Sequence, residues 1–205
     1  MHLEVLVEER SAEAALRQIL PRIAPAVSFE IRIFGGKPDL LVQLPKRLRA
    51  YHKWIPEDLR VVVLVDADSD DCGELKASLE RVAKDADFTT KASPCGGGRF
   101  EVVNRIAIEE LEAWFFGDVE ALVTAYPRVP VSLDKQARYR HPDAVPGSTW
   151  EALERVLQRA SYYRGGIPKI EVAERVAKHM EDPARNRSPS FQVFVAGVQA
   201  LVDQA

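Results

Sequence analysis

The sequence predicts an α/β protein with a mostly parallel sheet flanked by helices, and three observations support this fold class. Residues 61–65 are five consecutive apolar residues, which is typical of a strand buried on both faces of a parallel sheet. Two strand-like segments precede this run, and segments with apolar residues at helical spacing separate the three. Such a β-α-β-α-β-α order implies parallel strands joined by right-handed crossovers.

The predicted elements of this series follow one another closely along the chain. In order they are a strand at 3–8, a helix capped by Ser11, a strand at 27–34, a helix from Asp39 to Tyr51, a strand at 61–66 and a helix at 70–86. Pro45 is expected to bend or break the second of these helices, because proline lacks the backbone donor that a helix interior uses.

The character of the chain changes after a further strand at 99–106 and a helix at 107–116. Prolines punctuate the next segment, and helices are predicted only at 149–160, at 169–180 and from Ser190 onward. We therefore predict an α/β domain at residues 1–119 and a mostly helical C-terminal extension, residues 120–205, packed on it.

The composition of the chain is that of a globular protein. It has 205 residues, of which 46% are hydrophobic and 29% are charged. No apolar run approaches the roughly 20 residues that a membrane span needs, and the first residues lack a signal-peptide pattern. Cys72 and Cys95 provide neither a disulfide framework nor a four-ligand zinc site. We expect a cytoplasmic protein without a membrane partner.

Acidic residues follow the buried strand directly. Asp66 and Asp68 are two positions apart, so in extended backbone their carboxylates point the same way. Two converging carboxylates repel each other, and a hard cation such as Mg²⁺ relieves that repulsion. The alternative is that these acids, with Asp70 and Asp71, only cap the next helix or favour its first turn.

The net charge of −3 argues against general binding to polyanions, but the basic residues are unevenly placed. They form three groups, which are Lys46, Arg47, Arg49 and Lys53, then Lys135, Arg138 and Arg140, and last Arg185 and Arg187. Such a group is either a local phosphate-binding patch or a solvated helix face.

Four segments of the chain together carry a family resemblance. They are Val7-Glu8-Glu9-Arg10-Ser11, Val65-Asp66-Ala67-Asp68-Ser69, Glu109-Glu110-Leu111-Glu112-Ala113-Trp114 and Ser190-Phe191-Gln192-Val193-Phe194. These segments resemble the DUF4276 family, which is Toprim-like. The Toprim fold occurs in topoisomerases, primases and OLD-type nucleases. Its members use a Glu after the first strand and an Asp-x-Asp after a later strand, with Mg²⁺, to break or join phosphodiesters.

The resemblance implies specific roles for residues of this chain. Glu8, Asp66 and Asp68 would hold Mg²⁺ or Mn²⁺, and Glu8 is alternatively the base that activates water. Lys37 and Arg99 are candidates for holding phosphate, the alternative being ordinary surface cations.

Glu112 borders an apolar stripe on its predicted helix, so it is either catalytic or part of a structural ion pair. Where many Toprim proteins have Gly after the first Glu, this chain has Glu9.

Two function classes follow from the resemblance. The first is a Mg²⁺-dependent nuclease or phosphodiesterase in mobile-element or phage defence, with nucleic acid or a nucleotide phosphodiester as its partner. The second is a non-catalytic binding or regulatory module that acts with a partner protein. The observation that suggests it is Glu9, at the position where many Toprim proteins have Gly. Because OLD-type nucleases carry an ATPase domain, a separate ATPase is a candidate partner. A third class, with less support, is phosphoryl transfer to or from a nucleotide. The sequence also leaves open whether the protein forms a homo-oligomer.

Overall fold

The structure is a computed structural model that describes residues 1–54 and 58–204, and it confirms the predicted fold class. Its sheet has four strands, all parallel, in the order β2-β1-β3-β4. The strands are β1 (His2–Val7), β2 (Ser28–Ile33), β3 (Leu59–Asp66) and β4 (Val102–Ala107). Each lies within a few residues of the strand that the sequence predicts.

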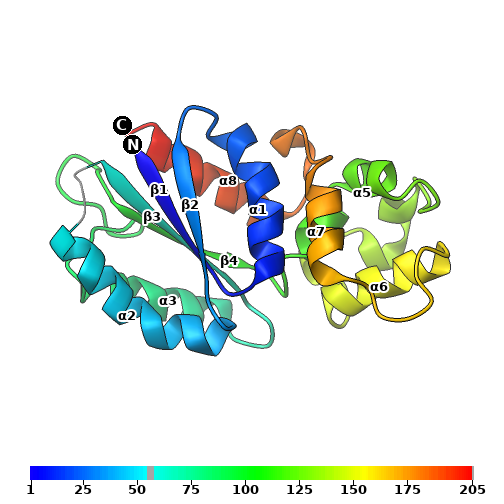
Figure 1. The fold of residues 1–205 in the computed structure, drawn as a ribbon, viewed down its shortest axis with the longest axis horizontal. Coiled ribbons are helices and arrows are strands. Elements are labelled where there is room, and N and C mark those ends of the chain that lie inside the picture. Colours follow the sequence, from blue (N-terminus) through cyan, green and yellow to red (C-terminus); the bar gives the residue numbers. More distant parts are fainter. Residues whose placement is uncertain (55–57, 205) are drawn as a thin grey trace.

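Helices cover both faces of this sheet (Figure 1). On one face lie α1 (Arg10–Ile23) and α8 (Pro189–Val202), and on the other lie α2 (Lys37–Trp54) and α3 (Cys72–Lys84). The central strand β3 alternates between the two cores: Val62 and Leu64 face the first pair of helices, whereas Val61, Val63 and Val65 face the second. This two-sided burial explains why residues 61–65 form an unbroken apolar run.

The remaining helices lie beyond the carboxyl ends of the strands (Figure 1). They are α4 (Ala113–Gly117), α5 (Val119–Ala125), α6 (Thr149–Arg159) and α7 (Lys169–Ala177). Three short 3-10 turns, η1 (Leu133–Lys135), η2 (Ala137–Tyr139) and η3 (Pro142–Ala144), lie between α5 and α6, and η4 (Pro183–Arg185) lies between α7 and α8. The helix α7 packs against α1, and α8 packs against β4. The C-terminal half therefore contributes to the layer that covers the sheet.

Three local predictions differ from the structure. Helix α1 begins at Arg10, so Ser11 lies inside it and its hydroxyl donates to Glu9 rather than capping the helix. Helix α2 continues through Pro45 without ending. The helix predicted at 107–116 is largely absent, because α4 begins only at Ala113; Glu109 has a φ of 61°, which a right-handed helix cannot contain.

One apolar core joins the segments on the two sides of the predicted boundary at residue 119. Trp114 is fully buried, its ring lies 5.1 Å from that of Phe191 and 5.0 Å from that of Phe194, and its Nε1 donates to Ser190 at 3.0 Å. The division at residue 119 stays a prediction, and Ala205 at its end lies outside the described residues. Among the described residues, no helix is long and apolar enough to cross a bilayer.

The contacts of Trp114 predict a large loss of stability on truncation. We expect Trp114→Ala to lower the free energy of unfolding by about 3–5 kcal/mol, because it opens a cavity between α4 and α8. Urea denaturation followed by circular dichroism measures this. As a control, Val131→Ala should change it by less than about 0.5 kcal/mol, since Val131 is 77% exposed. Equal effects of the two substitutions would contradict a core shared by α4 and α8.

Candidate functional site

Glu8 and Asp66 meet at the carboxyl end of the sheet. Strand β1 ends at Val7 and its neighbour β3 ends at Asp66, so the two acids follow adjacent parallel strands. The amide of Asp66 donates a hydrogen bond of 2.6 Å to Oε1 of Glu8. Both residues remain partly exposed. The sheet therefore brings them together at the edge where open α/β sheets bind ligands.

Glu112 adds a third carboxylate from the segment between β4 and α4. Its side chain is 1% exposed, and neither carboxylate oxygen has a hydrogen-bond partner. The neighbouring residues hold it in place: Trp114 lies in the core, and Oε2 of Glu110 accepts hydrogen bonds from Ser148, Thr149 and Trp150 at the start of α6. Glu112 is thus fixed between two anchored residues and cannot turn to water.

Lys169 is the cation that faces these acids. Its Nζ lies 2.5 Å from Oε1 of Glu9 and 3.8 Å from Oε1 of Glu112. Ser11 donates to the same Glu9 oxygen at 2.6 Å. Glu9 has a φ of −147°, which any residue adopts, so the position after Glu8 does not require Gly here. Instead Glu9 fixes the first residue of α7 beside the site.

The acids of this cluster hold their protons more tightly than ordinary carboxyls. Burial raises the pKa of Glu8 to about 7 and that of Glu112 to about 7. The hydrogen bond from the Asp66 amide opposes the rise in Glu8, and the charge of Lys169 opposes that in Glu112. Burial raises the pKa of Asp66 well above its usual value, and the negative charges of Glu112 and Glu8 raise it further. Burial alone would lower the pKa of Lys169, but the carboxylates of Glu112, Glu9 and Asp66 raise it. At neutral pH the site is therefore poised between protonation states.

The side chain of Asp68 does not point the same way as that of Asp66, although residues two apart in one strand would do so. It lies beyond the end of β3 with a φ of 50°, and its amide donates to the carbonyl of Glu109, which has the same left-handed conformation. Its Oδ2 lies 2.7 Å from Nζ of Lys37. Asp68 and Glu109 are thus hydrogen-bonded neighbours that both have a left-handed backbone, which is costly for residues other than glycine. Such backbone strain is concentrated at functional sites.

Lys37 has four oxygen neighbours. Besides Asp68, its Nζ contacts Oδ2 of Asp70 at 2.8 Å and the carbonyl oxygens of Asp66 at 3.1 Å and Ala67 at 3.0 Å. An ammonium has three hydrogens, so Lys37 as it lies has no donor left for a phosphate. Its predicted phosphate role would require it to leave these partners.

Arg99 is not brought to the carboxylates. It lies in the exposed loop that leads into the amino end of β4, where its carbonyl accepts a hydrogen bond from Cys95. The carboxylates lie at the carboxyl ends of the strands, and in a parallel sheet that is the opposite edge. Phosphate binding by Arg99 at this site is therefore not supported by the fold.

The residues of the cluster have the chemistry of a site for a hard cation. Glu8, Asp66 and Glu112 supply the oxygen ligands that Mg²⁺ prefers. The oxygens of Glu112 have no hydrogen bond, and once deprotonated they carry charge that a cation would offset. Within residues 1–54 and 58–204, however, no three His, Cys, Asp or Glu side chains converge closely enough to hold a metal ion. Metal binding would therefore require side-chain rotation at partly exposed Glu8 and Asp66.

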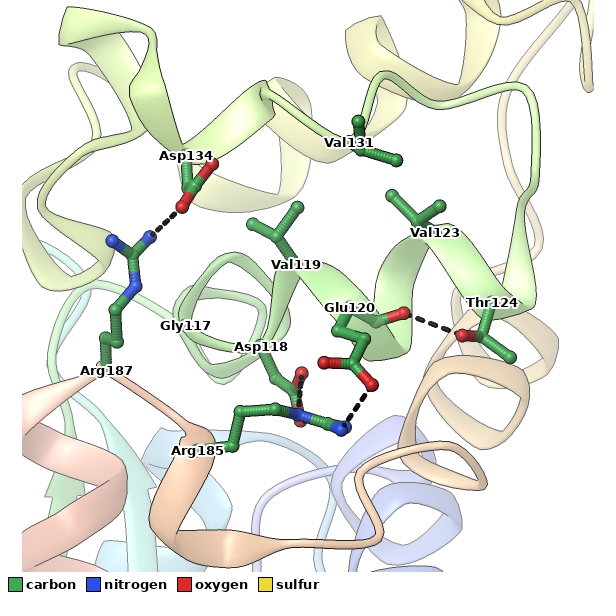
Figure 2. A pocket seen from close by; sticks show the side chains of 10 residues that line it. All are labelled: Gly117, Asp118, Val119, Glu120, Val123, Thr124, Val131, Asp134, Arg185 and Arg187. Atoms are coloured by element: carbon green, nitrogen blue, oxygen red, sulfur yellow. Dashed lines mark hydrogen bonds and ion pairs between the residues drawn. The ribbon is translucent and has the colours of Figure 1, made fainter.

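A cavity lies elsewhere, between α5 and the segment at 185–187. It measures about 440 Å³, and Val119, Val123 and Val131 line its apolar part (Figure 2). Arg185 is already engaged there, since it binds both oxygens of Asp118 and also Glu120. Arg187 pairs with Asp134 at 3.4 Å. None of the clustered carboxylates lines this cavity, so we do not treat it as the candidate site.

Comparison with known proteins identifies the family. Residues 7–199 match the family model described as a domain of unknown function, DUF4276, so the chain belongs to that family. The match begins one residue before Glu8 and includes Asp66, Glu112 and Lys169. A search of curated proteins and a search of solved structures gave no significant match.

The raised pKa values predict that the metal-free protein loses stability as pH rises. Between about pH 4.5 and 7 the unfolded chain has released protons that folded Glu8 and Glu112 still hold, so unfolding becomes easier with rising pH. Glu112→Gln removes one such group and should be more stable than wild type at pH 8, by on the order of 3 kcal/mol at most. The difference should shrink toward pH 5.

Melting temperatures in EDTA from pH 5 to pH 8.5 measure this. Glu154→Gln, on the partly exposed side of α6, is the matched control and should follow the wild-type curve. A Glu112→Gln curve parallel to that of wild type would show that Glu112 is not the source of the pH dependence.

Proposed function

We propose that this protein cleaves phosphodiester bonds with the help of Mg²⁺ or Mn²⁺. The observation that carries the proposal is the carboxylate of Glu112, which has no hydrogen bond and is buried beside Asp66 and Glu8 at the ligand-binding edge of the sheet. A structural ion pair would satisfy such a group with hydrogen bonds, whereas Lys169 stays 3.8 Å away. Buried acids with strongly raised pKa values in this position favour a functional site.

Each residue of the site has a proposed role. Glu8, Asp66 and Glu112 would hold the cation, which when bound lowers the pKa of water and offsets charge on the phosphate. Alternatively, Glu8, which is partly exposed and has a pKa of about 7, would leave the cation to the other two acids and accept a proton from the attacking water. Lys169 carries a positive charge at every physiological pH and would steady the negative charge that develops on the phosphate.

Asp68 stays a proposed ligand through the resemblance to Toprim proteins. Its carboxylate would have to exchange Lys37 for the cation, and Lys37 would then be freed to bind phosphate. The Toprim relationship itself, and a setting in mobile-element or phage defence, belong to this proposal. The Toprim relationship is supported by the positions of Glu8 and Asp66 at the carboxyl ends of adjacent strands and by the backbone of Glu9, which does not require Gly. The defence setting follows only from that resemblance.

A second function is a non-catalytic binding module that acts with a partner, such as a separate ATPase. One observation favours it: Lys169 and Lys37 already offset the charges of Glu9, Asp68 and Asp70, so these acids have counter-charges within the protein. Cleavage by the isolated protein would exclude this function.

The first test is cleavage by the purified protein. Single- and double-stranded DNA, RNA and cyclic nucleotides are incubated with Mg²⁺ or Mn²⁺, and products are resolved on gels. We expect metal-dependent cleavage that falls at least 100-fold in Asp66→Asn and Lys169→Met, because each removes a charge from the site. Lys178→Met, in the exposed position after α7, is the control and should retain full activity. No cleavage of any substrate by wild type would refute the proposed enzyme.

The second test separates metal binding from catalysis. Saturating Mn²⁺, at about 100 times its dissociation constant, should stabilise the wild type by about 2.7 kcal/mol, which raises its melting temperature by roughly 5–10 °C. Glu112→Gln should lose most of this shift. Asp68→Asn tests the role of the second Asp, because Asn tolerates the left-handed backbone as well as Asp does. If Mn²⁺ raised the melting temperature of Glu112→Gln as much as that of wild type, Glu112 would not be a metal ligand. The same result for Asp68→Asn would show that Asp68 is not a ligand.

A further inference from the structure

The helix α2 carries a concentration of positive charge that the carboxylate site does not use. Residues 37–54 contain five Lys and Arg residues and a single acid, Asp39, whereas the rest of the chain contains 23 Lys and Arg against 30 Asp and Glu. A chain with a net charge of −3 thus places a strongly basic helix on an otherwise acidic molecule. Such an asymmetry is typical of a surface that binds a polyanion.

Three of these cations form one exposed stripe. Lys46, Arg49 and Lys53 are spaced three and four residues apart, which places them on the same face of the helix. All three are exposed, and among the described residues no acid pairs with them. Surface cations without acidic partners keep their full charge for a ligand. We call these three residues the α2 stripe.

The inner face of α2 argues against a membrane-surface helix. Leu40, Leu44 and Leu48 are each 0% exposed, because they pack in the core between α2 and the sheet. A helix that binds a bilayer needs an apolar face free to enter it, and here the apolar face is already buried. Apart from Val42, which is 78% exposed one turn before Lys46, the stripe offers charge rather than a free apolar face, which suits the sugar-phosphate backbone of a nucleic acid.

The position of the stripe relative to the site sets the size of the ligand. Helix α2 begins at Lys37, which contacts the backbone of Asp66, and then runs away from the carboxylates (Figure 1). At 1.5 Å per residue, Lys46 lies about 14 Å and Lys53 about 24 Å along the helix from Lys37. A single nucleotide cannot reach both the site and the stripe. A strand of about seven nucleotides can, because one strand of a duplex rises about 3.4 Å per nucleotide.

We propose that the α2 stripe binds the phosphate backbone of a nucleic-acid strand whose scissile bond lies at the carboxylate site. This inference rests on the proposed phosphodiester cleavage and narrows its substrate to a polynucleotide. The stripe contributes affinity without reading sequence, because lysine and arginine contacts to phosphates are independent of the bases.

The test compares two triple variants with the same change in net charge. The first is Lys46→Glu/Arg49→Glu/Lys53→Glu, and the control is Lys135→Glu/Arg140→Glu/Lys178→Glu, at exposed positions outside α2. Binding of a fluorescent 20-nucleotide single strand is measured by anisotropy in EDTA, from 50 to 200 mM NaCl. We expect the stripe variant to bind at least tenfold more weakly at 50 mM NaCl. Its log–log salt slope should be shallower by about 2, at about 0.7 per lost contact.

Substrate length separates this inference from the proposed function. With Mn²⁺, wild type and stripe variant should cleave a dinucleotide equally, whereas the variant should cleave the 20-nucleotide strand at least tenfold less efficiently at low substrate concentration. Equal loss of DNA binding in the stripe variant and the control variant would overturn the inference. It would also be overturned if the stripe variant bound phosphatidylserine vesicles more weakly than wild type but bound DNA equally well. Absence of cleavage by wild type would overturn the proposed function, while the metal-free binding measurement would still test the stripe.

Discussion

The charge of Glu112, held away from water without a hydrogen bond, is the constraint on which the rest of the site depends. Placing a carboxylate in such surroundings is unfavourable, so the protein either keeps it protonated or places a cation nearby. Lys169 meets that need only in part, because its nearest approach is 3.8 Å and its shorter contact is to Glu9. The cluster thus retains a negative charge that a bound cation would offset.

The helices that follow the sheet complete this site as well as covering it. Glu8 and Asp66 come from the strands, but Lys169 comes from the start of α7 and Glu112 is held by the contacts of Glu110 with the start of α6. The match to the DUF4276 model likewise runs from the first strand into α8. The parallel sheet supplies an edge for the acids, and the helical half supplies their counter-charge and excludes water from one of them.

The strands and the first half of the site could be predicted from the sequence. The apolar run at 61–65 defines a central strand, and parallel topology then places Glu8 and Asp66 at one edge. The direction of Asp68 could not be predicted, because the alternation of side chains ends with the strand and Asp68 turns into a left-handed conformation toward Lys37. The apolar stripe that Glu112 borders predicts a helix at 107–116, but Glu109 has a φ of 61°, which interrupts a right-handed helix.

Other site residues lie beyond the reach of local patterns. Lys169 is 160 positions from Glu9, and its own neighbourhood, Pro168 followed by an amphipathic helix, indicates only where α7 begins. The placement of Arg99 at the opposite edge follows from its position before β4 rather than after it. A basic helix is visible in the sequence, whereas the exposure and missing acidic partners of Lys46, Arg49 and Lys53 are properties of the fold.

Proton release on metal binding tests the central claim most directly, because a cation at these carboxylates must displace the protons that their raised pKa values retain. Isothermal titration calorimetry with Mn²⁺ in buffers of different ionisation enthalpy gives the number of protons released. Around pH 6, where Glu8 and Glu112 are still largely protonated, we expect one to two protons per Mn²⁺, falling toward zero by pH 9. In Glu112→Gln this number should drop by about one, if binding is retained. No binding of Mn²⁺, or binding without proton release at pH 6, would contradict a metal site at Glu8, Asp66 and Glu112.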